Sequence, residues 1–186
     1  MSFWDAWRER RALRDAAELY ARAAWAEPED ADVRWLAEAA TGGDEDHARW
    51  ELRYCRRAVA LLVAEREALD DRTAAAVAHA LVERLHRDRT VAVERVSMAE
   101  RQFNARLTRY RDALRERGGG TPAERVAAAL LAVSRGGQPV DRVDARAADL
   151  VGTYTEAARE RLRACFGVAQ LPEHVRPSEA VLRDRG

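Results

Sequence analysis

The amino-acid sequence predicts an all-α protein, an up-and-down antiparallel bundle built from long amphipathic helices. Apolar residues recur at intervals of three and four positions through most of the 186 residues, which is the spacing of one helix face. Alternating runs of β-branched residues, the usual sign of strands, extend over no more than a few positions. The connections between the periodic segments are short, and short connections make consecutive helices antiparallel neighbours.

Capping residues and helix breakers divide the chain into its expected helices. Asp44 and Asp71 are expected N-caps, and residues 121–124 form a capping box with proline at the first helical position. Pro28 and Gly167 are expected stops. The expected helices cover about residues 3–27, 30–40, 45–69, 72–87, 90–117, 122–133 and 140–166.

A run of three glycines at residues 118–120 is the expected flexible joint of the chain. Residues 1–117 are expected to form a helical bundle. Residues 121–186 are expected to supply two further helices and a tail, packed on the same bundle as one domain. A chain of this length can bury a substantial core.

Composition argues against several classes of protein. A transmembrane helix needs about 20 mostly apolar residues, and the longest apolar runs, 58–64 and 126–133, are less than half that length. The N-terminal segment mixes acids and bases without the apolar stretch of a signal peptide, so the expected compartment is the cytoplasm. Cys55 and Cys165 have neither metal-binding spacing nor a disulfide pattern, and both are expected to be small buried apolar residues.

The charged residues also exclude particular chemistries. All 32 basic residues are arginine, which excludes a Schiff-base lysine and the lysine of a P-loop, and the glycines form neither GxGxxG nor GxSxG. The formal net charge is zero, which argues against a nucleic-acid partner. Arg49, Arg53, Arg56 and Arg57 share one side of the third expected helix and are interpreted as a solvated outward face.

Four residues form a candidate metal site. His47, Glu51 and Glu65 fall within the apolar sector of the third expected helix. Glu100 interrupts the apolar seam of the fifth. A buried carboxylate needs a compensating partner, and a pair of iron or manganese ions held by inward carboxylates is one such compensation in helical bundles.

A metal is not the only way to accommodate these four residues. They can pair with arginines in a buried network, which is the arrangement favoured here, or they can lie near helix ends where water reaches them. Glu83 and His86 have the Glu-x-x-His spacing of a metal pair. These two side chains and His79 point away from the apolar stripe of their own helix, however, and are expected to be solvated.

All five tryptophans lie between residues 4 and 50. Phe3, Trp4 and Trp7 lie roughly opposite the apolar stripe of the first expected helix, so both faces of that helix need cover. The cover can be the C-terminal tail or the second helix, a protein partner or second copy, or a membrane surface. Phe3, Trp4 and Trp7 are therefore the candidate interface residues.

Residues 95–110 resemble one helix of the LemA family, whose pattern reads R-[IV]-S-x-A-x-[RK]-x-[FY]-N-x-x-[VL]-x-x-Y. The matching residues are Arg95, Val96, Ser97, Ala99, Arg101, Phe103, Asn104, Leu107 and Tyr110. The resemblance implies an antiparallel helical bundle and transfers no site residue. The N-terminal membrane anchor usual in that family is not expected here.

The function expected from these observations is that of a cytoplasmic, non-enzymatic helical bundle that acts through protein contacts or self-association. The alternative is a ferritin-like or oxidase-like bundle in which His47, Glu51, Glu65 and Glu100 hold iron or manganese. No cofactor is favoured. The expected partner is another protein or a second copy of the chain, with no nucleic acid and no integral membrane segment.

Overall fold

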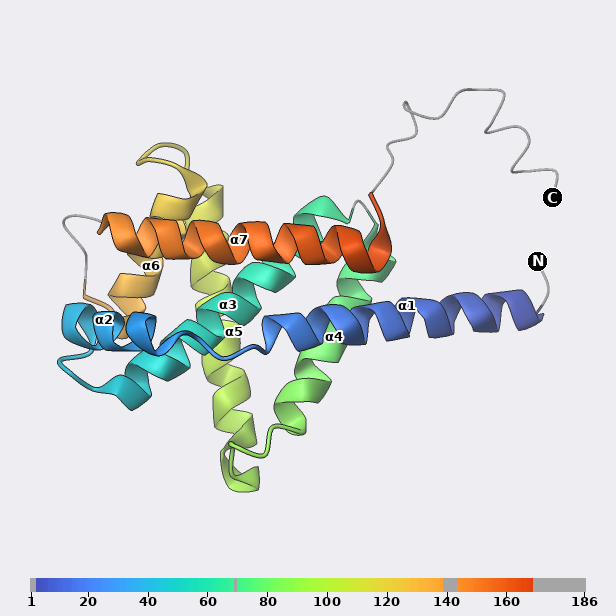
Figure 1. Cartoon of the computed structure of the whole chain (residues 1–186), viewed down its shortest axis with the longest axis horizontal. Coiled ribbons are helices and arrows are strands. Elements are labelled where there is room, and N and C mark those ends of the chain that lie inside the picture. Colours follow the sequence, from blue (N-terminus) through green and yellow to red (C-terminus); the bar gives the residue numbers. More distant parts are fainter. Residues whose placement is uncertain (1–2, 69, 139–143, 169–186) are drawn as a thin grey trace.

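Seven α-helices and one short 3₁₀ helix make up the computed structural model, which describes residues 3–68, 70–138 and 144–168 (Figure 1). In chain order they are α1 (Phe3–Ala24), α2 (Asp30–Ala40), α3 (Glu45–Glu67), α4 (Asp71–His86), η1 (Val93–Arg95), α5 (Val96–Arg115), α6 (Pro122–Ser134) and α7 (Ala145–Phe166). The described segments contain no strand, so the predicted all-α bundle is confirmed. None of these helices is long and apolar enough to cross a membrane.

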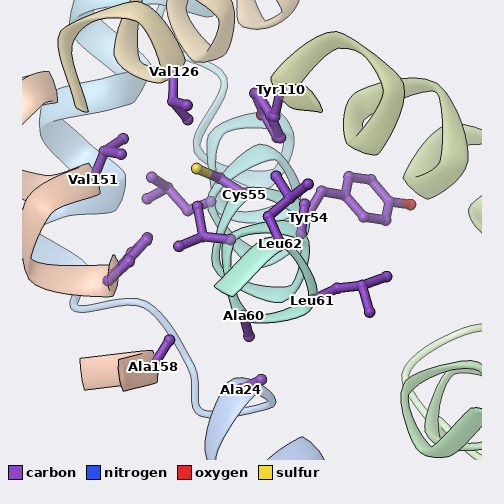
Figure 2. Close-up of a cluster of buried hydrophobic side chains, with 14 of the residues drawn as sticks. Ala24, Tyr54, Cys55, Ala60, Leu61, Leu62, Tyr110, Val126, Val151 and Ala158 are labelled. Atoms are coloured by element: carbon purple, nitrogen blue, oxygen red, sulfur yellow. The ribbon is translucent and has the colours of Figure 1, made fainter. Parts of the chain in front are cut away.

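The third helix, α3, lies at the centre of the bundle and packs against every other α-helix. Thirteen of its 23 residues are buried, and a helix buried all round is one that other helices surround. Figure 2 shows Tyr54, Cys55 and Leu61 leaving α3 in different directions. The apolar run at residues 58–64 is therefore the middle of the core rather than one face of an amphipathic helix.

The other helices cover α3 from several directions. In Figure 1, α1 and α7 run antiparallel across the molecule, whereas α4 and α5 form a steeper hairpin. The first helix packs against α4 and α7, and α6 packs against α5 and α7. Tyr20 ties α1 to the centre, because its buried hydroxyl donates a hydrogen bond of 2.8 Å to the carbonyl oxygen of Ala60 in α3.

Several helix ends follow the predicted caps. The Asp44 carboxylate accepts from the backbone N–H of His47 at the start of α3. Thr121 and Glu124 form the predicted capping box of α6. Gly120, just before it, has φ +100°, and a Cβ there would collide with the Glu124 carboxylate, so this turn requires glycine.

Other boundaries differ from the prediction. The cap of α4 is Asp70 and not Asp71, because the Asp70 carboxylate accepts from the backbone N–H of Thr73 at 2.7 Å. The predicted end of the third helix at residue 69, the predicted start of the last helix at 140 and the tail after 168 lie outside the described residues.

The fifth helix begins at Val96 rather than at residue 90. The cause is local: the Asp88 carboxylate accepts from both the backbone N–H and the hydroxyl of Thr90, at 3.0 and 2.7 Å. Such side-chain turns compete with helix formation. Val93, predicted to lie in the apolar seam, is instead 84% exposed in η1.

Gly152 in α7 is the one glycine inside a described helix. Glycine in a helix interior is less favourable than alanine by about 1 kcal/mol. A Cβ at this position would meet nothing within 4 Å. Packing therefore does not explain why the residue is glycine.

Both cysteines are free thiols. Cys55 is buried, as expected, and burial raises the pKa of its thiol to about 12. Cys165 is only partly buried, because it lies in the last turn of α7. The expectation of a buried cysteine holds for Cys55 alone.

Candidate functional site

The structure does not bring the four predicted metal ligands together. His47 and Glu51 are one turn apart on α3, with His47 Nε2 3.4 Å from Glu51 Oε1. Glu65 lies on the same helix about 20 Å further along, by the helical rise per residue, and Glu100 lies on α5. Within the described part of the chain, no three His, Cys, Asp or Glu side chains are placed to hold one metal ion.

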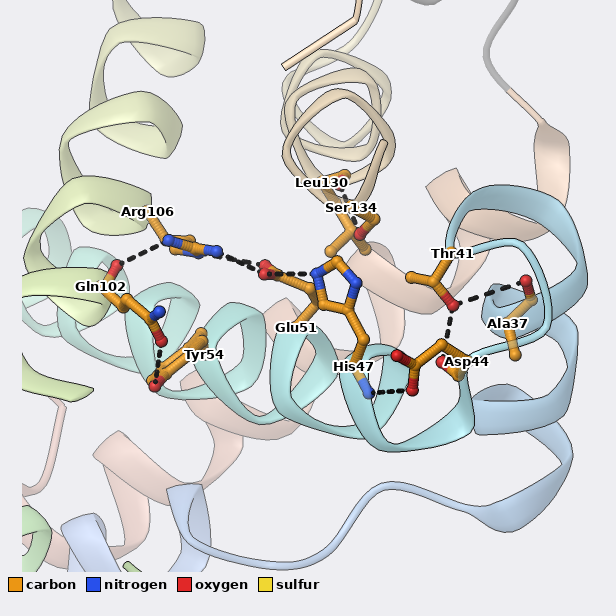
Figure 3. A network of polar contacts seen from close by, with 10 residues as sticks. All are labelled: Ala37, Thr41, Asp44, His47, Glu51, Tyr54, Gln102, Arg106, Leu130 and Ser134. Atoms are coloured by element: carbon orange, nitrogen blue, oxygen red, sulfur yellow. Dashed lines mark hydrogen bonds and ion pairs between the residues drawn. The ribbon is translucent and has the colours of Figure 1, made fainter. Parts of the chain in front are cut away.

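Glu51 is the centre of a buried polar network (Figure 3). Its side chain is 1% exposed, and both carboxylate oxygens accept from Arg106 of α5, with Arg106 Nε 3.1 Å from Oε2. The hydrogen bond to Glu51 raises the pKa of the Arg106 guanidinium, although its burial acts in the opposite direction. This two-point contact is the geometry that best offsets the cost of burying a carboxylate.

The network extends along the contact between α3 and α5. The Arg106 guanidinium lies over the Tyr54 ring, 5.5 Å from its centroid. The Tyr54 hydroxyl donates to Gln102 Oε1 at 3.2 Å. For Glu51 the structure supports pairing with arginine, the favoured alternative. Its carboxylate is not exposed to water, and it belongs to no cluster of metal ligands among the described residues.

Glu65 pairs with an arginine, as favoured, but near the surface rather than in a buried network, and Glu100 is placed differently from the prediction. Glu65 is paired with Arg111 of α5 near the surface, with Arg111 NH2 2.8 Å from Oε1 and the Glu65 side chain 37% exposed. Glu100 is 39% exposed, and its Oε2 lies 3.5 Å from Nε2 of His86. It was predicted to pair with a buried arginine, which is wrong because it lies where the α4–α5 hairpin meets solvent.

The helix-wheel interpretation of α4 is confirmed. His79 and His86 have side chains that are 70% and 52% exposed, and Glu83 is paired with Arg87 at 2.9 Å. These side chains form a solvated face, as expected.

A second buried polar cluster was missed by the sequence analysis. Arg57, predicted to face outward, is 2% exposed. Its guanidinium carbon lies 3.5 Å from the centroid of the Trp25 ring, and its NH2 is 3.7 Å from Asp88 Oδ2. Its NH1 has no hydrogen-bond partner among the described residues. Burial lowers the pKa of Arg57 to about 10, an effect that the charge of Asp88 partly opposes.

Asp88 holds this cluster in place. Burial alone would raise the pKa of its carboxyl, but hydrogen bonds from Thr90 and Trp25, together with the charge of Arg57, lower it below the usual value. The Trp25 indole donates to Oδ2 at 3.2 Å. One sequence signal could have found the cluster: Arg57 directly precedes the apolar run at residues 58–64, where an exposed side chain is unexpected.

The predicted interface residues lie on the outer face of α1. Trp4 is 64% and Trp7 43% exposed, and Leu19 on the same side is 46% exposed. The Arg11 guanidinium covers the Trp7 ring at 5.5 Å. Phe3 is the first residue of α1, and its side chain lies outside the described part. The second helix packs on α3 and α6 and leaves Trp4 and Trp7 exposed, so that alternative for their cover is wrong. The C-terminal tail, the other expected cover within the chain, lies outside the described residues.

The opposite face of α1 is packed only in its C-terminal half. Ala17, Tyr20 and Ala24 are buried in the core, whereas most residues between 4 and 15 are exposed. Figure 1 shows the N-terminal half of α1 extending beyond the other helices. The chain thus presents a helical arm with two large aromatic side chains.

Comparison of the chain with models of known families, with characterised proteins and with solved structures finds no match. The resemblance of residues 95–110 to the LemA family stays a prediction.

Proposed function

We propose that this chain is a non-enzymatic helical protein that acts by self-association through the outer face of α1. The observation that carries the proposal is the exposure of Trp4, Trp7 and Leu19 along one side of the projecting helix. Exposed apolar side chains grouped on one surface are typical of interaction sites. Tryptophan in particular anchors protein interfaces.

Apart from Arg11, which meets its own copy near the axis, the outer face of α1 is complementary to itself in an antiparallel pair. Trp4, Arg8, Arg11, Asp15 and Leu19 follow one another at steps of three or four residues, so they form a single stripe. In an antiparallel pair of these helices, Trp4 of one copy lies opposite Leu19 of the other, and Arg8 lies opposite Asp15. A twofold axis near residue 11 generates both contacts twice, as an isologous dimer requires.

The charges of the stripe are available for such contacts. Within one chain, Arg8 pairs with Asp5 at 3.3 Å and Arg11 with Asp15 at 3.8 Å, and all four side chains are more than half exposed. Exposed pairs of this kind contribute little to folding stability. Exchanging them for contacts across a dimer therefore has a small energetic penalty.

The proposal includes a cytoplasmic location. It is supported by the free state of both cysteines, since reduced thiols are usual in the cytosol. No catalytic step is proposed, because the two buried polar clusters hold structural hydrogen bonds and ion pairs.

Sedimentation and light scattering over a range of protein concentrations test the proposal. We expect a dimer for the unaltered chain and a monomer for the Trp4→Ala, Trp7→Ala double variant. At concentrations low enough to dissociate the dimer, the two melting temperatures should be similar, because both side chains are exposed in the single chain. The matched control is the Val93→Ala, Met98→Ala variant. It also removes exposed apolar side chains, 84% and 50% accessible, but far from α1, and should stay dimeric.

A charge exchange makes the test specific for the antiparallel arrangement. Arg8→Asp alone places two acidic residues opposite each other and should weaken the dimer. Adding Asp15→Arg restores opposite charges and should recover dimerisation. A chain that is monomeric at all concentrations, or a dimer indifferent to Trp4 and Trp7, would show that the proposal is wrong.

A further inference from the structure

A cleft of about 290 Å³ opens between α3, α5, α6 and α7, away from the α1 arm. Its size is close to the lower end of the range of small-molecule sites. Its walls are mainly aliphatic and come from Val59, Leu62, Val63, Leu114, Val126 and Val151. Four helices thus converge on a largely apolar hollow that none of the described side chains fills.

The rim of the cleft carries four charged side chains, of which three are bound to one another. Arg159 is hydrogen-bonded to both Glu67 and Glu156, and these two contacts raise the pKa of its guanidinium. One guanidinium offsets one of the two carboxylates, so these three side chains keep a net charge of −1, and with Arg66 the four charged side chains are neutral overall.

The fourth rim side chain, Arg66, has no such partner. Every other arginine of α3 has a hydrogen bond or ion pair to an acceptor, at residues 27, 30 or 88. Arg66 has neither within the described residues, and it lies on the rim of the cleft. It is a guanidinium fork available to an external carboxylate.

Gly152 lies in the wall of the same cleft. It is the helix-interior glycine whose identity packing does not explain, since a Cβ would enter open space. Because glycine has no side chain, the cleft is wider at this part of α7. Glycine at this position lowers the stability of α7 but widens the cleft. A ligand in the cleft would explain why glycine is present.

We propose that this cleft binds an amphipathic monocarboxylate, with its aliphatic chain against the apolar walls and its carboxylate at Arg66. The walls supply the apolar contact that drives binding. Arg66 supplies the charge that orients the molecule. The site is separate from the α1 arm, so binding does not depend on self-association.

Isothermal titration with octanoate, octan-1-ol and octylammonium tests the proposal on the full chain. Octanoate is expected to bind about fivefold more tightly than octan-1-ol, the scale of one partly exposed ion pair, and octylammonium most weakly. The Arg66→Gln variant should bind octanoate and octan-1-ol equally. Its control is Arg109→Gln, an exposed arginine of α5 outside the cleft, which should leave the preference unchanged.

Changes at Gly152 test the location. Gly152→Leu should abolish binding of both octanoate and octan-1-ol, whereas Thr153→Leu, which places the same side chain at the next, exposed position, should not. If Gly152→Leu fails to fold, Gly152→Ala should weaken binding while raising the melting temperature. Absence of octanoate binding, stronger binding of octylammonium, or a Gly152→Ala variant with unchanged affinity would overturn the proposal.

Discussion

Two buried charges on α3 differ in how well the bundle satisfies them. Glu51 is 1% and Arg57 2% exposed, and both lie on the same helix. Glu51 has a guanidinium bonded to both of its oxygens. Arg57 has its nearest carboxylate oxygen at 3.7 Å, a tryptophan ring against its face, and one nitrogen without a partner among the described residues.

The comparison shows that equal burial does not mean equal dependence on the ion partner. Glu51 is a carboxylate whose charge is offset almost wholly by one residue, Arg106. Several factors together accommodate the buried Arg57: its guanidinium stacks on Trp25, the charge of Asp88 lies nearby, and its pKa is lowered. Removing the partner should therefore be more damaging at Glu51 than at Arg57.

The largest effect is expected for Arg106→Ala. It leaves the Glu51 carboxylate buried with His47 as its remaining ion-pair neighbour among the described residues, and should lower the free energy of unfolding by about 3–5 kcal/mol. The matched control, Arg111→Ala, breaks the ion pair with the partly exposed Glu65 and should cost less than about 1 kcal/mol. Chemical denaturation measures both. Similar losses for the two variants would contradict the comparison.

Asp88→Asn should have an intermediate effect, a loss of about 2 kcal/mol, because the amide keeps some hydrogen bonds but leaves Arg57 without its counter-charge. The effect should depend on pH. The pKa of Asp88 is lower in the folded protein than its ordinary value, which is about 3.9. Its contribution is therefore complete above that value and is lost as pH falls through the lower folded pKa.

Denaturation of the unaltered chain and of Asp88→Asn at a series of acidic pH values checks this prediction. The difference in unfolding free energy between the two should be constant above about pH 5 and should shrink below about pH 4. A difference that grows on acidification would contradict the ion-pair account of Arg57.

The smallest effect is expected for Glu100→Leu, and it should be stabilising. Glu100 lines a small pocket together with Leu81, Leu85 and Phe103, and its partner His86 is exposed. Leucine adds apolar burial worth about 1 kcal/mol, which raises the melting temperature by roughly 2–4 °C. A thermal melt measures this change in melting temperature. The control is Glu94→Leu, a substitution on the exposed η1 turn. A lower midpoint would mean that Glu100 has a buried partner after all.

Local signals made much of the fold predictable. The caps at Asp44 and Thr121 act on backbone N–H groups three residues away, so the sequence alone contains both partners. The helical periodicity likewise depends on neighbours within two turns. The start of α5 was predicted wrongly because the same kind of local contact, Asp88 with Thr90, was taken for helix.

The candidate site was harder to predict because its contacts join distant segments. Arg106 lies 55 residues from Glu51 along the chain, and nothing near either residue reveals the pairing. A helix wheel assigns one face to the core, yet α3 is covered on all sides, so the outward assignment of Arg57 failed. Glu100 fits an apolar seam by spacing, but the seam extends beyond the core at that end of α5.

The packing of α1 against α7 constrains the order in which the chain can fold during synthesis. The core-facing stripe of α1, with Ala17 and Tyr20, needs α7 for part of its cover, and α7 begins only at Ala145. Ribosomes add about 5–20 residues per second, so this stripe waits roughly ten seconds for its last neighbour. A nascent chain from which α7 has not yet emerged leaves that stripe without part of its cover, and closure of the bundle awaits α7.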